Sequence, residues 1–163
     1  MQLTSLITIF RALNEAEVKY LVVGGLAVVA HGYERMTADL DLVIGLEPDN
    51  IVSGLRVLEN VGYRMAVPVT PEQFADAGNR EAWRREKEML VLKLWSDLHQ
   101  RTPIDVFVYE PFDMEAECAR AVWVNLDEDV AVPILALPAL IKMKQEAGRP
   151  QDLADIAELG QQF

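Results

Sequence analysis

The sequence predicts a mixed α/β fold, of the α+β kind, in which a small mixed β-sheet carries flanking helices and a helical C-terminal end. Three observations support this prediction. Amphipathic helical segments alternate with short apolar segments of strand length. A polar turn joins two neighbouring strand candidates, as in an antiparallel pair. Residues 137–163 show helical periodicity alone.

The N-terminal elements follow from spacing and from glycine stops. Apolar residues at helical spacing predict a helix over residues 3–15, and Gly32 and Gly62 end two later helices. The first strand is predicted in KYLVVGG, broken by Gly24 and Gly25, and a two-turn helix in LAVVAHG. A second strand is expected from Thr37 to Ile44, followed by a helix that begins at Pro48-Asp49-Asn50.

The second half is predicted in the same way. Thr70 and Pro71 form a helix-start signature, and the segment NREAWRREKE is helical in composition. Strands are expected in MLVLKLW and PIDVFVY, which flank the turn SDLHQRT. They are followed by a helix in PFDMEAECARA, short strands in VWVNL and VAVPIL, and two helices joined at Gly148-Arg149-Pro150.

The composition limits the class of protein. With 163 residues, we expect one domain over 1–163, with its core at about 17–110 and a C-terminal helical part at about 137–163. No leader-like or membrane-spanning segment is visible, which predicts a cytoplasmic protein. One cysteine and two histidines exclude an internal disulfide and disfavour a zinc site, so any metal must be bound by oxygen. A net charge of -11 disfavours broad nucleic-acid binding without excluding a local basic groove.

Two like charges interrupt the second predicted strand. Asp39 and Asp41 are two residues apart, so on a strand they project from one face while Leu40, Leu42 and Ile44 project from the other. Two carboxylates about 4 Å apart repel by about 1 kcal/mol in bulk water and about 4 kcal/mol at an effective dielectric near 20. Such a pair raises one of its own pKa values unless a cation lies between them. An edge strand whose acids discourage aggregation is the plainer alternative.

A third acid has the same setting. Asp105 alternates against Ile104, Val106 and Val108. If its strand neighbours that of Asp41, three carboxylates converge, and this suits Mg²⁺, which binds a few carboxylates together with substrate phosphates. Such ions serve in-line phosphoryl displacement, so the chemistry indicated is transfer from a nucleoside triphosphate.

A phosphate partner is expected close by in the sequence. Gly24 and Gly25 stand where a strand passes into a helix, which leaves backbone N–H groups free and no side chain to keep a triphosphate away. Alone, a Gly-Gly pair is a weak signal. Followed after thirteen residues by Asp39-Leu40-Asp41, it is much stronger.

These residues also carry a family resemblance. GGLAVVAHGYERMTADLDL resembles the signature of the polymerase-beta-like nucleotidyltransferase superfamily, and Asp105 matches its third metal-binding carboxylate. The tail LPALIKMKQEAGRPQDLADIAEL resembles the final motif of the AbiEii-type toxin branch, whose Lys, Arg, Asp and Asp correspond to Lys144, Arg149, Asp152 and Asp155.

The resemblance implies a nucleotidyltransferase fold with Mg²⁺ at the catalytic residues Asp39, Asp41 and Asp105. It also implies a triphosphate over Gly24 and Gly25. Toxins of that branch transfer nucleotides, in some cases onto tRNA, which implies an acceptor RNA and a cognate toxin or antitoxin partner. Where the superfamily more often has Gly-Ser, this chain has Gly24-Gly25 and so lacks a hydroxyl that can touch phosphate.

Several residues have two interpretations. Arg35 and Thr37 either contact phosphate or order their loop, and Lys144 and Arg149 either bind the triphosphate or end a solvated helix. His31 is more typical of a packed histidine than of a base. Asp152 and Asp155 either stabilise a helix N-terminus or hold Arg149. The basic stripe Arg80, Arg84 and Lys87 belongs to a charged surface helix or to an RNA contact.

The function also has alternatives. The acceptor hydroxyl belongs to RNA, to a small molecule such as an antibiotic, or to a partner protein, as in minimal nucleotidyltransferase antitoxins. A nucleotide-binding or partner-binding module without activity is the other alternative. The net charge of -11 slightly favours acceptors other than RNA.

Overall fold

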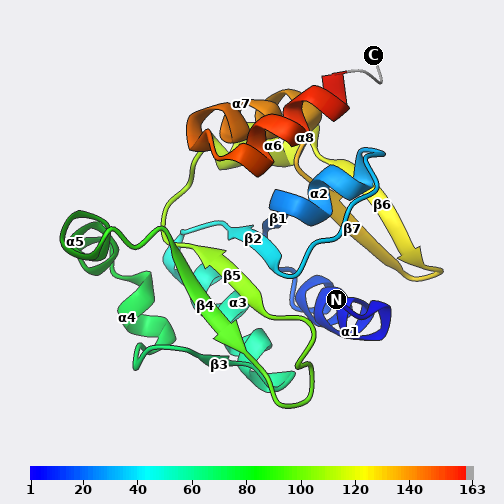
Figure 1. Ribbon diagram of the computed structural model, residues 1–163. Helices are drawn as coiled ribbons and strands as arrows, with labels where there is room; N and C mark the ends of the chain where they lie inside the picture. Colours follow the sequence, from blue (N-terminus) through cyan, green and yellow to red (C-terminus); the bar gives the residue numbers. More distant parts are fainter. Residues whose placement is uncertain (161–163) are drawn as a thin grey trace.

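Residues 1–160 of the computed structural model are described here, and they contain a seven-stranded mixed sheet of order β3-β4-β5-β2-β1-β7-β6 (Figure 1). Its strands are β1 (Tyr20–Val23), β2 (Leu40–Ile44), β3 (Arg64–Met65), β4 (Val91–Trp95), β5 (Ile104–Phe107), β6 (Val122–Asp127) and β7 (Val130–Ile134). The β2–β5 and β1–β7 pairs are parallel, and the other neighbouring pairs are antiparallel. The predicted mixed sheet and the antiparallel β4–β5 pair are therefore confirmed.

Helices flank this sheet, as predicted. They are α1 (Leu3–Glu15), α2 (Gly24–Ala30), α3 (Pro48–Asn60), α4 (Pro71–Ala75), α5 (Ala77–Lys87), α6 (Met114–Arg120), α7 (Leu137–Ala147) and α8 (Pro150–Gly160). Thr70 caps α4 through a complete capping box, with Pro71 in the first turn. None of the helices within residues 1–160 combines the length and the apolar character needed to cross a bilayer.

The sheet has one face that belongs to the core and one that is partly open. Leu40, Leu42 and Ile44 of β2 are fully buried, and Ile44 lies against Gly54 of α3. Helix α7 packs against both α8 and α2, and these three helices lie above β2 in the view of Figure 1. The apolar face of β2 is therefore as predicted, while its other face carries Asp41 together with the buried Val43.

Strand β2 is shorter than predicted, since it begins at Leu40 and not at Thr37. Asp41 pairs with Val23, the last residue of β1. The residues before Leu40 lie opposite the start of α2 and therefore have no β1 residue with which to pair. On the other side, Leu40 donates its N–H to the carbonyl of Pro103, the last backbone group before β5. Asp39 consequently lies in a bend just before the strand.

One strand was not predicted. β3 spans two residues, Arg64 and Met65, which pair with Trp95 and Leu94 of β4. Two residues are too few to show an alternating pattern, so the signal on which strand prediction depends is missing.

Candidate active site

The two strand acids lie side by side. Asp41 of β2 and Asp105 of β5 are register partners in the parallel pair, so their side chains project from the same face. Asp39, in the bend before β2, lines the same pocket, whose volume is about 560 Å³. The expectation that the strands of Asp41 and Asp105 are neighbours is confirmed.

Burial and mutual repulsion make this acidic site costly to ionise without a cation. Burial raises the pKa of Asp41 to about 7, and the charges of Asp105 and Asp39 add to the effect, while Arg149 and Lys144 oppose it. The pKa of Asp105 is raised by burial too, against the charge and hydrogen bonds of Lys93. A cation placed here would therefore stabilise the ionised carboxylates.

The donor set fits a hard cation that shares its ligands with a substrate. Within residues 1–160, no group of three or more His, Cys, Asp or Glu side chains is close enough together to hold an ion by itself. Mg²⁺, however, commonly takes one or two carboxylates and completes its shell with phosphate oxygens and water. Asp39 and Asp41 fit that requirement, and the assignment of Mg²⁺ to Asp39, Asp41 and Asp105 stays a prediction.

The glycine pair brings the backbone directly against the acids. Gly24 has φ +65°, and a Cβ there would lie 2.0 Å from Oδ2 of Asp41. A Cβ at Gly25 would lie 2.4 Å from Oγ1 of Thr37. Any larger residue at either position would displace a side chain of the site. Both glycines are therefore needed for the backbone to approach the side chains of Asp41 and Thr37 this closely.

A second, smaller pocket adjoins the first. It has a volume of about 270 Å³, and its own lining includes Gly25, Arg35 and Thr37. The two pockets share six residues, namely Gly24, Asp39, Asp41, Lys144, Arg149 and Asp152. Asp39 and Asp41 thus lie at the junction of a larger and a smaller pocket.

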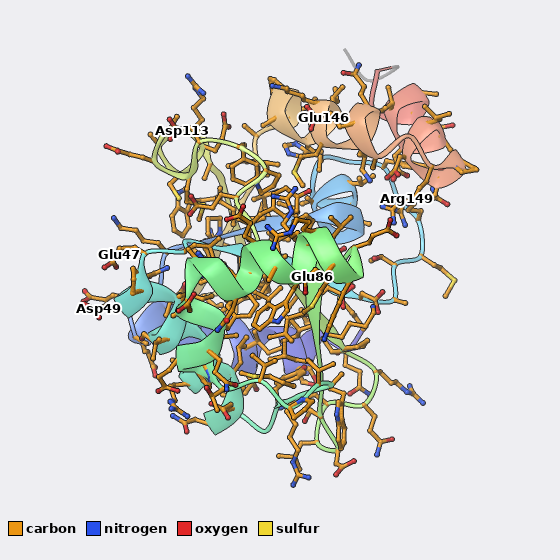
Figure 2. The ribbon with its side chains drawn as sticks, turned by 90° about the vertical axis from the view of Figure 1, so that its left-hand side faces the viewer. Glu47, Asp49, Glu86, Asp113, Glu146 and Arg149 are labelled. Carbon is orange, nitrogen blue, oxygen red and sulfur yellow. The ribbon has the colours of Figure 1, made fainter. Side chains whose placement is uncertain are left out.

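Two buried aspartates of α8 hold the cations of this junction. Asp155 lies 2.8 Å from Nζ of Lys144, and it also accepts from Nη2 of Arg35 at 2.9 Å. Asp152 accepts from Nε of Arg149 at 2.7 Å and from Lys144 at 3.3 Å. Figure 2 shows Arg149 at the turn between α7 and α8, in the view that has α5 nearest the reader.

The electrostatics of these two aspartates favour their ionised form. Burial alone would raise the pKa of each carboxyl group. At Asp152 the hydrogen bonds and charges of Arg149 and Lys144 outweigh the effect of burial. At Asp155 the hydrogen bonds of Lys144 and Arg35 and the charge of Lys144 do the same. Both pKa values are therefore below their usual range. The interpretation in which these aspartates hold Arg149 therefore applies to Asp152, whereas Asp155 pairs with Lys144 and Arg35 instead.

Solved structures share this architecture. One is the lincosamide antibiotic adenylyltransferase LnuA bound to lincomycin, with 17% identity, 96% of this chain and 95% of that chain covered, and a TM-score of 0.61. Another is an antigenic nucleotidyltransferase-like protein from Paracoccidioides brasiliensis, with 16% identity, 96% and 74% coverage, and a TM-score of 0.60. The chain has the nucleotidyltransferase fold.

A third structure with this fold is ANT(2")-Ia in complex with adenylyl-2"-tobramycin. It shares 14% identity over 97% of this chain and 86% of that chain, with a TM-score of 0.59. No protein-family model matches the chain, and no curated protein matches its sequence. The nucleotidyltransferase fold predicted from the resemblance is therefore confirmed at the level of architecture, while the AbiEii-type branch stays a prediction.

Sequence reasoning missed part of this site. Lys93 of β4 pairs with Asp105 in register, and its ammonium lies 3.2 Å from Oδ1. Phe107 and Tyr109 line the larger pocket, and the guanidinium of Arg84 lies 3.9 Å from the centre of the Tyr109 ring. The alternation of MLVLKLW could have indicated that Lys93 shares the face of Asp105, because the two predicted strands form a hairpin.

Two other predicted features lie apart from the junction. The Nε2 of His31 contacts the carbonyl of Leu135 at 2.8 Å, and His31 lines neither pocket, which favours a packed histidine. The basic stripe is interrupted, because Arg80 is buried and donates to the carbonyl of Phe74 at 2.7 Å. The prediction of one exposed basic stripe over Arg80, Arg84 and Lys87 is therefore wrong, because Arg80 satisfies a backbone carbonyl at the C-terminal end of α4.

Proposed function

We propose that the protein is a Mg²⁺-dependent nucleotidyltransferase that moves a nucleoside monophosphate from a triphosphate to a hydroxyl group. The observation that supports this best is the junction itself, where Asp39 and Asp41 lie between two pockets of different chemistry. A transferase of this kind needs one site for the leaving pyrophosphate and another for the attacking hydroxyl. The cation, when bound at Asp39 and Asp41, would neutralise charge on the phosphates.

The smaller pocket suits the triphosphate. Its lining combines the backbone of Gly24 and Gly25 with the cationic side chains of Arg35, Lys144 and Arg149. Arg149 is largely exposed although Asp152 fixes it, so its remaining N–H groups are free to reach a ligand. Charge-assisted hydrogen bonds from such groups are among the strongest that a phosphate receives.

The larger pocket suits the acceptor. In an in-line displacement, the acceptor oxygen forms its bond to the α-phosphorus while the bond to the pyrophosphate oxygen breaks on the opposite side. With the triphosphate over the glycines, the acceptor approaches from the side of Asp105, which lines the larger pocket and not the smaller one. We therefore assign to Asp105 the role of taking the proton of the acceptor hydroxyl.

A small hydroxylated compound is the acceptor class that the pocket favours. A volume of about 560 Å³ is that of a site for a small molecule, and Phe107 and Tyr109 give it an aromatic side. Two proteins of the same fold carry lincomycin or adenylyl-tobramycin in their structures. The RNA acceptor and the toxin–antitoxin partner depend on the resemblance, and burial of Arg80 weakens the RNA contact expected on α5.

The substitution Asp41→Asn tests the function. It removes a junction carboxylate while keeping the shape of the side chain, so we expect label transfer to fall by about 10²–10³-fold, the usual loss for one electrostatic group of an active site. Asp97→Asn, in the exposed turn between β4 and β5, removes the same charge elsewhere and should leave transfer unchanged. The measurement is transfer from α-labelled triphosphates with Mg²⁺ to lincomycin, tobramycin, total RNA or a co-expressed protein.

The outcomes separate the alternatives. Full activity of the Asp41→Asn variant would contradict the assignment of the site. Label in RNA or in protein would show that the acceptor is RNA or protein and not a small hydroxylated compound. Stabilisation by triphosphates in a thermal-shift titration, without transfer to any acceptor, would support the binding module, since a ligand at 100 times its dissociation constant adds about 2.7 kcal/mol.

A further inference from the structure

The third acid of the site already holds a cation of the protein. Nζ of Lys93 lies 3.2 Å from Oδ1 and 3.3 Å from Oδ2 of Asp105, so the ammonium is shared between both carboxylate oxygens. The Asp105 side chain is 12% exposed and that of Lys93 is 65% exposed. The carboxylate is thus fixed by its surroundings, and the lysine reaches it from the solvent side.

The sheet register fixes this arrangement. Asp41, Asp105 and Lys93 are successive partners across β2, β5 and β4, and they project from one face. Because neighbouring strands lie about 4.8 Å apart, the backbone of Lys93 is about 10 Å from that of Asp41. Asp105 therefore lies between an acidic neighbour on one side and a basic neighbour on the other.

The other cations of the larger pocket are engaged elsewhere. Lys144 and Arg149 pair with Asp152 and Asp155 of α8. Lys93 is, among the described cations lining this pocket, the one that forms an ion pair with a member of the group Asp39, Asp41 and Asp105. Its position is therefore specific to Asp105.

We infer that the Lys93 ammonium takes the place beside Asp105 that a second divalent cation would occupy, so that the site holds one such ion, at Asp39 and Asp41. The inference rests on the proposed function, because it concerns the ion that would accompany the triphosphate. A divalent ion beside Asp105 would meet the ammonium at short range, and this repulsion weakens its binding. Lys93 thereby supplies charge neutralisation at Asp105 without a second metal.

Counting bound Mn²⁺ tests the inference without any turnover. The full chain, in excess over α,β-methylene-ATP, is titrated with Mn²⁺ while the free ion is measured by electron paramagnetic resonance. For the wild-type chain we expect one tightly bound ion per analogue, with a second equivalent bound at least about tenfold more weakly. Lys93→Gln should tighten the second equivalent at least about tenfold, and Lys93→Met should do the same.

Two matched variants control for charge. Lys93→Arg keeps the cation and should behave as the wild type, and Lys142→Gln removes an exposed lysine of α7 that does not line the larger pocket and should change nothing. Two equally tight ions in the wild type, or no tightening in the Lys93 variants beyond that in Lys142→Gln, would overturn the inference. If the analogue fails to raise the thermal unfolding midpoint of the wild type, the proposed function fails instead, and that result is distinguishable from a wrong ion count.

Discussion

At the scale of single residues, Thr37 explains why glycine stands at position 25. The superfamily resemblance has a serine more often at this place, but a Cβ at Gly25 would lie 2.4 Å from Oγ1 and 2.9 Å from Cβ of Thr37. The hydroxyl of Thr37 thus occupies the space next to the glycine backbone. A hydroxyl is still present at the smaller pocket, supplied by a different residue.

Gly25→Ser should therefore destabilise the protein. Overpacking a site of this kind costs about 1–3 kcal/mol, and Gly25→Ser/Thr37→Gly should recover most of that loss because it removes both close atoms. Gly160→Ser is the matched control, since a Cβ at Gly160 meets no atom within 4 Å. Urea denaturation of the four proteins measures the effect, and equal stability of the Gly25→Ser and Gly160→Ser variants would contradict it.

The acids were predictable from sequence, and so was the face on which their basic partner lies, but the register of that partner was not. Asp41 and Asp105 interrupt apolar alternation, so their common face follows from the two-residue period alone. Lys93 is in register with Asp105 only because of the length and path of the turn between β4 and β5, which alternation does not specify. The same limit applies to Thr37, whose contact with Gly25 depends on where β1 ends.

At the scale of elements, buried ion pairs hold α7, α8 and the loop before β2 together. Asp155 is fully buried and pairs with Lys144 of α7 and Arg35 of the loop. Both cations line the smaller pocket, so the fold of the C-terminal helices also sets the positions of groups proposed to bind phosphate. Their function in the site depends on packing between elements.

Asp155→Asn should show this dependence. Removing one partner of a buried ion pair leaves cations without compensation, and this typically costs about 3–5 kcal/mol in the free energy of unfolding. Glu158→Gln, on the exposed side of α8, should cost little. Denaturant unfolding measures both, and a loss below about 1 kcal/mol for Asp155→Asn would show that the pairs are dispensable.

Element boundaries were predicted less well than the elements themselves. Apolar periodicity predicted α1, and the Thr70-Pro71 signature predicted α4, because both signals are local. The start of β2 depends on its neighbours, since Val23 ends β1 opposite Asp41 and Pro103 precedes β5. A strand exists only where partners are present, so local alternation overestimated its length.

At the scale of the whole molecule, two sets of aspartates act on stability in opposite directions of pH. The pKa values of Asp152 and Asp155 are lowered in the fold, so these carboxylates stabilise the native state at any pH above the ordinary pKa of aspartate. This contribution is lost as the pH falls through the lowered pKa values. The raised pKa of Asp41, about 7, acts in the other sense, because the native state keeps a proton that the unfolded chain releases. Its contribution is complete below about pH 4 and is lost as the pH rises to about 7.

The pH profile of unfolding should therefore depend on Asp41. The quantity to follow is the free energy of unfolding of the wild type minus that of the Asp41→Asn variant, measured without divalent cations. This difference should fall as the pH rises from about 4 to about 7, by at most about 1.4 kcal/mol per pH unit. The same difference taken against Asp97→Asn should lack this neutral-range fall, because both proteins keep Asp41. Urea unfolding at half-unit steps of pH in a chelating buffer measures both differences. A wild-type minus Asp41→Asn difference that stays constant, or rises, over this range would mean that the Asp41 carboxylate is already neutralised within the fold, and the junction would then have no unmet charge with which to attract a cation.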